Sequence, residues 1–364
     1  MSGTTTVRMI SAYNQMAAPT AFLAGFFRAP AENFYTSEEV EIDIVRSDEE
    51  IAIAVQDLST GYRMNLADIS TNKRFKPPIL KEAFPINAFD LLKRMPDDNP
   101  FEAPDFRANL IARIFRAMVP VEGKMRRTIE LQASQILQTG TVTLVDENGN
   151  ALYTIDFKPK ATHFPTAGTA WDQASPDIAG DILSLTNVIR NDGLSDPDQL
   201  IFGESALEVA LADADFKDRF ETRRIDRGTI SSFDVRGGGG QFRGVVEIGN
   251  YQLDVWTYSG RYNHPQTSVK TQFVDPGKVI VRDSGGRMDA TFGAIPNIGA
   301  MLGAQATSLL PELPGRLSNS GGGMDLFTNA WLTPDGEQLF AGLGARPLLI
   351  PTAIDTYGCL NTGI

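Results

Sequence analysis

The sequence has 364 residues, of which 42% are hydrophobic and 21% are charged. This balance is typical of a folded globular protein and excludes the disordered and collagen-like classes, while the length favours about two modules. The 33 basic and 45 acidic residues give a net charge of −12. Such an acidic excess argues against a protein that reads nucleic acid sequence, because phosphate contacts in those proteins require a basic excess.

The single cysteine, Cys359, excludes an intrachain disulfide and favours a reducing compartment. The first residues lack the apolar core of a signal peptide, and no stretch approaches the roughly 20 apolar residues that span a bilayer. We therefore expect synthesis in a cytosol and no membrane partner.

Residues 1–45 are expected to be largely irregular. Within them Ala21–Pro30 is apolar enough for a short helix, which Pro30 would end. From Glu32 to Asp57 the chain carries nine acidic residues and one basic residue, a net charge of −8. The chain thus begins as an arm with a strongly acidic end.

Residues 46–102 predict a long extended loop. A strand is expected at Ile51–Val55, and little periodicity follows it up to Pro100. From Lys73 to Arg94 there are six basic and two acidic residues, a net charge of +4. Loops of this length are rare inside compact domains unless they are functional or disordered, so we interpret the stretch as an arm that reaches onto a neighbour.

The clearest element is an amphipathic helix over Asp105–Gln138, whose apolar residues recur at steps of three and four. Pro104 suits the first turn and Gly140 suits the end, whereas Pro120 and Gly123 predict a kink or a short break. At 1.5 Å per residue the helix would be about 50 Å long. Its basic residues outnumber its acidic ones, which fits either a solvated face or a face near a neighbour or packaged DNA.

Two runs of alternating polar and apolar residues, Thr141–Val145 and Leu152–Phe157, flank an Asn148-Gly149 pair. An Asn-Gly pair between two such runs is the strongest short-range signal for a β hairpin. A hairpin is therefore expected directly after the helix.

From residue 175 the pattern changes to mixed α/β. Helices are expected at Asp177–Gly193 and Ser205–Phe220, with a short buried strand at Leu200–Phe202 between them. Further strands are expected in Val245–Gly260, at Lys278–Asp283 and at Pro347–Ile350, and a linker is expected at 311–323.

No constellation of residues supports an enzyme. His163 and His264 lie far apart in polar, proline-flanked surroundings and are interpreted as loop histidines. Cys359 could act as a nucleophile only if a base were brought to it. We therefore expect no catalytic, metal-binding or cofactor-binding residues.

Two local patterns resemble known sites but fail in detail. The run Gly237–Gly240 is followed by Gln241, where a phosphate-binding loop requires Gly-Lys-Ser/Thr, and a flexible hairpin tip fits better. Asp213 and Asp215 resemble the start of a calcium loop, but the central glycine is missing and they lie in an expected helix. Surface charge explains them.

The order of these parts resembles the Hong Kong 97-type capsid fold, an α+β fold. Several stretches are similar to the lambda-type phage major capsid protein (phage capsid E) family. The similar stretches are Gly61-Tyr62 with Leu91–Pro96, Gly168-Thr169 with Trp171, Phe216–Arg227, Tyr258–Gly260 with Tyr262, and Pro347–Leu349.

The resemblance implies five parts: an N-terminal arm (1–45), an extended E-loop (46–102), a P-domain with spine helix and β hairpin (103–174), an A-domain (175–323), and C-terminal strands that return to both domains (324–364). It implies a tailed-phage major capsid protein whose hexamers and pentamers form an icosahedral shell around double-stranded DNA. The implied location is the virion, after assembly in the host cytoplasm.

The partners implied are other copies of the chain, a scaffold, a portal and decoration proteins, and packaged DNA bound without sequence specificity. No cofactor is implied. Since no long charged helical prefix precedes the arm, a separate scaffold protein is expected. The alternatives are an encapsulin-like nanocompartment shell, an acidic hydrolase, and a tail-tube or receptor-binding module, which would be richer in strands and lack the long helix.

The charge map adds two hypotheses. The acidic arm of one subunit is expected to meet the basic loop of a neighbour and steer assembly. The overall negative charge is expected to keep packaged DNA from adhering to the wall. The proposed interface residues are Glu38, Glu39, Glu41, Asp48, Glu49, Glu50, Lys73, Arg74, Lys76, Lys81, Lys93 and Arg94.

Overall fold

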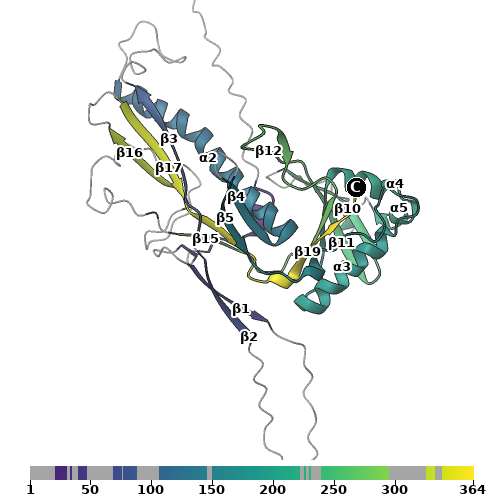
Figure 1. The fold of residues 1–364 in the computed structure, drawn as a ribbon. Coiled ribbons are helices and arrows are strands. Elements are labelled where there is room, and N and C mark those ends of the chain that lie inside the picture. The colour runs from purple at the N-terminus through teal and green to yellow at the C-terminus, as the bar shows by residue number, and fades with distance from the viewer. Residues whose placement is uncertain are drawn as a thin grey trace, which may run out of the picture.

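The structure, a computed structural model, describes most of the second half of the chain and parts of the first. Figure 1 shows two lobes, one built on a long helix and a small sheet, the other on a larger twisted sheet covered by shorter helices. The described residues are 21–30, 33–34, 40–46, 69–75, 77–87, 106–145, 150–221, 225–226, 229–230, 239–293, 295, 325–332 and 338–364.

The long helix, α2 (Phe106–Thr139), confirms the amphipathic helix expected from periodicity. Met118, Val121 and Met125 bury its apolar stripe against the small sheet. A kink or a short break was expected near Pro120; there is no break, because α2 runs through this residue. An interior proline costs about 3 kcal/mol, and burial of the apolar residues on both sides offsets that cost.

The helix ends at Gly140, as its sequence position indicates. This glycine has φ +68°, and a side chain there would collide with the ring of Pro159. The hairpin that follows, β4 (Thr141–Val145) and β5 (Ala151–Asp156), confirms the Asn-Gly signal.

The small sheet has the order β16-β17-β3, with all neighbours antiparallel. Its strands are β3 (Leu80–Asn87), β16 (Phe327–Leu332) and β17 (Gln338–Ala345). β3 lies inside the stretch that we expected to be an extended loop. The C-terminal part of the chain supplies its partner, which local sequence patterns do not reveal.

A separate antiparallel pair, β1 (Val40–Arg46) and β2 (Ile69–Phe75), projects away from both lobes (Figure 1). The strand expected at Ile51–Val55 and the linker expected at 311–323 lie outside the described residues.

The larger sheet has the order β19-β14-β6-β11-β10-β7, and only the pair β6–β11 is parallel. The strands are β6 (Gln199–Phe202), β7 (Phe220–Glu221), β10 (Gly240–Ile248), β11 (Tyr251–Tyr258), β14 (Lys278–Arg282) and β19 (Tyr357–Asn361). The expected strands at 200–202 and 278–283 are confirmed.

Alternate side chains of this sheet enter different cores, as strand geometry requires. Leu200 and Phe202 pack with helix α3 (Ile178–Gly193), whereas Ile201 packs with the C-terminal half of α2. The larger sheet is therefore buried on both faces, and α2 takes part in both lobes.

The helix expected at Ser205–Phe220 is divided into α4 (Glu204–Ala212) and α5 (Ala214–Asp218). Asp213 lies between them, and its side chain accepts a hydrogen bond from the backbone N–H of Phe216 at 2.8 Å. An aspartate in this role favours a helix start over a helix interior, which explains the break.

The remaining elements are short. The strands are β8 (Ile225–Asp226), β9 (Thr229–Ile230), β12 (Arg261–Asn263), β13 (Lys270–Gln272), β15 (Asp289–Phe292) and β18 (Pro347–Ile350). The 3₁₀ helices are η1 (Ala24–Phe26), η3 (Ala161–His163) and η5 (Ile354–Thr356). β18 confirms the strand expected at 347–350 and pairs with β15.

Candidate assembly surfaces and the joint between the lobes

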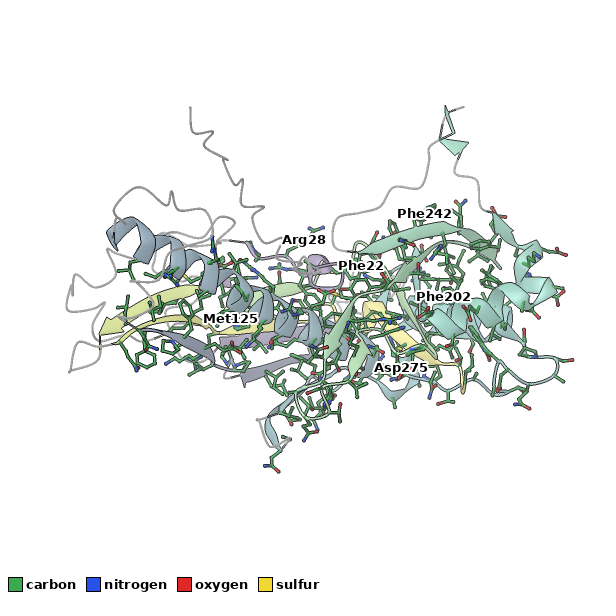
Figure 2. The ribbon with its side chains drawn as sticks, turned by 90° about the horizontal axis from the view of Figure 1, so that it is seen from above. Phe22, Arg28, Met125, Phe202, Phe242 and Asp275 are labelled. Carbon is green, nitrogen blue, oxygen red and sulfur yellow. The ribbon has the colours of Figure 1, made fainter. Side chains whose placement is uncertain are left out.

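The N-terminal segment, which we define as residues 21–30 and 33–34, is packed between the two lobes. Figure 2 shows Phe22 and Arg28 between the lobe that carries Met125 and the lobe that carries Phe202. The short helix expected here is reduced to the single turn η1. Its apolar side chains Phe22, Leu23, Phe27 and Phe34 are buried in the core beneath the larger sheet.

Glu130 of α2 holds the start of this turn. Its carboxylate accepts hydrogen bonds from the backbone N–H groups of Leu23 and Ala24, at 2.8 and 2.9 Å. These donors lie at a helix start, where no intrahelical acceptor exists. Burial raises the pKa of Glu130, although the hydrogen bonds from Ala24, Leu23 and the Tyr258 hydroxyl oppose the shift.

The same segment also contacts the larger sheet. The ring of Phe22 lies 5.2 Å from that of Tyr258, and the guanidinium of Arg282 lies 4.0 Å from the ring centroid of Phe26. Burial lowers the pKa of Arg282 to about 10, while the nearby carboxylates of Asp198 and Asp283 oppose the shift.

Backbone pairing fastens the rest of the segment to β15. The N–H of Arg28 donates to the carbonyl of Met288 at 2.8 Å, and the N–H of Ala290 donates to the carbonyl of Arg28 at 2.7 Å. Phe34 stacks on Phe292 with ring centroids 5.1 Å apart. The described part of the arm therefore binds its own subunit.

Gly240 corrects the interpretation of the glycine run as a hairpin tip. It is the buried first residue of β10, and a side chain there would collide with the ring of Phe22. The glycine is required because the N-terminal segment approaches the strand closely. Residues 237–238 lie outside the described part.

His163 is not the loop histidine that we expected, because it is buried in η3. Its Nδ1 lies 2.8 Å from the carbonyl oxygen of Tyr357, and its Nε2 lies 3.1 Å from Asp192. Burial raises the pKa of Asp192, but hydrogen bonds from Lys160 and His163 outweigh it and the net shift is downward. The group joins η3, α3 and β19.

The remaining candidates for chemistry have structural surroundings. Cys359 is buried in β19, and burial raises the pKa of its thiol to about 12. Within the described residues no group of three or more His, Cys, Asp or Glu side chains is placed to hold a metal ion. Among the described helices, none is long and apolar enough to span a membrane.

Part of the basic face of α2 is paired within the chain. Arg126 lies 2.8 Å from the buried carboxylate of Asp325, and Lys124 lies 2.8 Å from Glu82 of β3. The C-terminal end of α2 also holds the loop after β13, because the Gln138 amide donates to the carbonyl of Phe273 at 2.8 Å.

The proposed interface residues fall mostly outside the described part. The register of β1 and β2 places Glu41 opposite Arg74 and Ile42 opposite Lys73 in the same chain. Lys81 is exposed on β3. The members outside the described residues are Glu38, Glu39, Asp48, Glu49, Glu50, Lys76, Lys93 and Arg94.

The docking of the N-terminal segment was not predicted from the sequence. One signal was available, because Glu130 is an acidic residue directly beside Ile129 in the apolar stripe of α2. A buried carboxylate at such a position needs donors from elsewhere in the fold.

Comparisons with known proteins identify the family of the chain and support its fold. The family model for phage major capsid protein E matches residues 5–357, nearly the whole chain. The chain belongs to the phage major capsid protein E family. It is therefore a tailed-phage major capsid protein, a structural protein that self-assembles into the virion shell, and the resemblance noted in its sequence is confirmed.

One solved structure supports the fold. A prophage protein from Escherichia coli CFT073, named as a capsid protein, has 15% identity and a TM-score of 0.57, and the match covers 80% of this chain and 79% of that one. A protein of Gordonia phage Cozz has 10% identity and a TM-score of 0.47, with 95% and 88% covered. The mixed helix-and-strand fold is thus of the Hong Kong 97 type.

The encapsulin SrpI from Synechococcus elongatus PCC 7942 has 11% identity and a TM-score of 0.38, with 91% and 86% covered. A comparison with curated protein sequences gave no match.

Proposed function

We propose that copies of this capsid protein form the hexamers and pentamers of an icosahedral head that encloses packaged double-stranded DNA. The family match over residues 5–357 carries the proposal, because it includes both lobes and the projecting β1–β2 pair. The chain then acts by presenting surfaces to its neighbours and catalyses no reaction.

We assign the parts of the subunit as the sequence suggested: N-terminal arm (1–45), E-loop (46–102), P-domain (103–174), A-domain (175–323) and returning C-terminal strands (324–364). Two observations support this division: α2 continues into the β4–β5 hairpin, and β17 and β19 belong to different lobes. β1 (Val40–Arg46) crosses the boundary between arm and E-loop, because it pairs with β2 in the projecting pair.

Repetition is the physical basis of assembly in this proposal. Each interface is modest, but a subunit in a closed shell makes many of them at once, and avidity multiplies their effect. Head-to-tail contacts close into rings when the rotation between neighbours permits. A shell built in this way corrects errors while its contacts are still weak.

The proposed partners are further copies of the chain, a separate scaffold protein, a portal and decoration proteins. Packaged DNA lies against the shell wall without sequence-specific contacts, and the net charge of −12 supports a wall to which DNA does not adhere. Assembly takes place in the host cytoplasm.

The decisive experiment is expression of the chain alone and together with the scaffold and portal proteins of its own phage, followed by electron microscopy. Closed particles with six-fold and five-fold clusters are expected in at least the second case. A chain that remains monomeric beside those partners contradicts the proposal. A second test is mass spectrometry of purified virions, in which this chain should be the most abundant protein.

Charge between subunits is the proposed steering force. The acidic segment 32–57 of one subunit meets the basic segment 73–94 of a neighbour, in addition to the pairing of β1 with β2 inside each chain. Exposed ion pairs contribute little individually, but these repeat at every interface. Assembly should therefore slow as ionic strength rises from low to physiological values, and a rate indifferent to salt contradicts this mechanism.

A further inference from the structure

The hairpin of β12 and β13 stands apart from the sheet that it follows. It forms its own two-stranded sheet with three residues in each strand. The residues of its turn from Pro265 to Val269 are all exposed. The base of the hairpin packs on its own chain, where the ring of Tyr262 lies 5.1 Å from that of Phe273, whereas the exposed tip is available to a neighbouring surface.

The tip of the hairpin nevertheless has a defined shape. The N–H of His264 donates to the carbonyl of Val269 at 3.0 Å, and the N–H of Ser268 donates to the carbonyl of His264 at 2.9 Å. Ser268 has φ +54°, a conformation that few residues other than glycine adopt. This turn holds Val269 outward, with 59% of the residue exposed.

Among the described residues of 175–323, the exposed large hydrophobic residues are Val269 and Leu211, and Ile364 at the end of the chain is exposed in the same lobe. Leu211 lies on α4, where Glu204, Glu208 and Leu211 follow one another at helical spacing on the exposed face. Large apolar groups in these positions are candidates for contact with another surface.

The charges around the two apolar residues are opposite. The hairpin from Ser259 to Val274 contains Arg261 and Lys270 and no acidic residue. The helices α4 and α5 span Glu204–Asp218 and contain five acidic residues (Glu204, Glu208, Asp213, Asp215, Asp218) and one basic residue. Within one chain Arg261 already lies 3.5 Å from Glu204, so groups of these two surfaces attract each other.

The two surfaces meet at the start of α4, where Arg261 lies 3.5 Å from Glu204, and they extend from there in different directions. Figure 1 shows β12 on the side nearest α2, and α4 and α5 at the far end. One chain presents the basic tip in one direction and the acidic helices in another. This is the arrangement that a head-to-tail ring contact requires.

We propose that the β12–β13 hairpin of one subunit docks on α4 and α5 of the next subunit in the ring, with Val269 packed on Leu211. Lys270 lies among the carboxylates of the neighbour, in the way that Arg261 lies beside Glu204 in its own chain. This inference rests on the proposed function, because it names the partner surface for the ring.

The first test reverses charge on purified protein under the conditions in which the wild type forms particles. Lys270→Glu should slow assembly by about tenfold at low salt, and Glu208→Lys with Asp215→Lys should do the same. Combining the three changes should return the rate close to that of the wild type. A combined variant no faster than its slower parent overturns the inference.

Two matched controls make the same substitution elsewhere. Lys217→Glu makes the acidic surface more acidic and should not slow assembly. Lys158 has 73% of its side chain exposed and lies outside both surfaces, so Lys158→Glu should be neutral. Equal rates for Lys270→Glu and Lys158→Glu overturn the inference.

A crosslink tests the geometry directly. Val269→Cys with Leu211→Cys should give disulfide-linked multimers after mild oxidation of assembled particles, and not in unassembled chains. Cys359 does not interfere, because it is buried. Assembled particles without crosslinks overturn the packing of Val269 on Leu211. If the wild-type chain forms no closed particles even beside its scaffold and portal proteins, it is the proposed function that fails.

Discussion

The N-terminal segment and the β12–β13 hairpin are both short pieces of chain beside the larger sheet, yet their surroundings are opposite. Phe22 and Leu23 are 6% and 0% exposed, whereas Val269 is 59% exposed. The N–H groups of Leu23 and Ala24 meet a carboxylate of α2, whereas Lys270 and Val269 face outward.

This difference in burial separates stabilisation of the subunit from contact between subunits. Burial between the lobes stabilises the subunit itself, because apolar area is removed from water and buried donors meet acceptors. The tip of the β12–β13 hairpin is exposed and charged, so its side chains can contact a neighbouring subunit. Substitutions in the N-terminal segment should therefore change stability, and substitutions in the hairpin should change assembly.

The largest effect on stability is expected for Phe22→Ala. The buried ring leaves a cavity against Tyr258 and Gly240, which should cost about 3 kcal/mol in the free energy of unfolding. The urea midpoint of the unassembled chain measures this. A change below about 1 kcal/mol would mean that the segment is not part of the subunit core.

Gly240→Ala should follow, with a loss of about 2 kcal/mol, because the added methyl group collides with the ring of Phe22. Gly168→Ala is the matched control, since a side chain there meets nothing within 4 Å. Combining Gly240→Ala with Phe22→Ala should cost less than the sum of the two changes. If the stability losses of the two substitutions were strictly additive, the contact between Gly240 and Phe22 would be contradicted.

Glu130→Gln should destabilise the chain by about 1 kcal/mol, because its amide group cannot accept the second backbone N–H. The wild type should also show a pH dependence that the variant lacks. In the native state the pKa of Glu130 is raised above its ordinary value of 4.5. Between pH 4.5 and the native pKa, the native state therefore retains a proton that the unfolded state has lost. The stability from this group is present below pH 4.5 and decreases as pH rises through the native pKa.

The measurement is the melting temperature of both proteins from acidic to neutral pH. The difference in melting temperature between the two proteins should shift in favour of Glu130→Gln as pH rises above the ordinary pKa range of glutamate. Parallel curves would show that the carboxyl group is not held in this desolvated site.

The smallest effect on stability is expected for Val269→Ser, within about 0.5 kcal/mol, because the exposed side chain loses no contact in the isolated subunit. Particle yield should fall, since the substitution removes the apolar group at the tip. A variant that is unstable, or that assembles as the wild type does, would remove the distinction between the two regions.

Local elements could be predicted because their causes are local. The periodic apolar stripe predicted α2, and the Asn148-Gly149 pair predicted the β4–β5 hairpin. The division of α4 from α5 depended on Asp213, whose side chain can cap a helix as easily as lie within one. Sequence alone did not decide between these roles.

Contacts between segments that are far apart in the sequence could not be predicted in the same way. β3 pairs with β17 through a register that joins Leu80 to Ala345, and Phe34 stacks on Phe292. Such contacts join residues that are distant in the chain, and no local pattern specifies which distant strand will be the partner. The burial of His163 likewise depends on contacts with Tyr357 and Asp192. The residues next to His163 in the sequence do not indicate these contacts.

The sequence by itself determined the family, the long helix, the hairpin and the acidic and basic segments, because these follow from residue order and composition. Tertiary structure decided that the N-terminal segment is fastened between the lobes and that the tip of the β12–β13 hairpin remains exposed. The physical reason is that burial is a property of the folded whole. Phe22 and Val269 are both apolar, and only the chain around each determines which is covered.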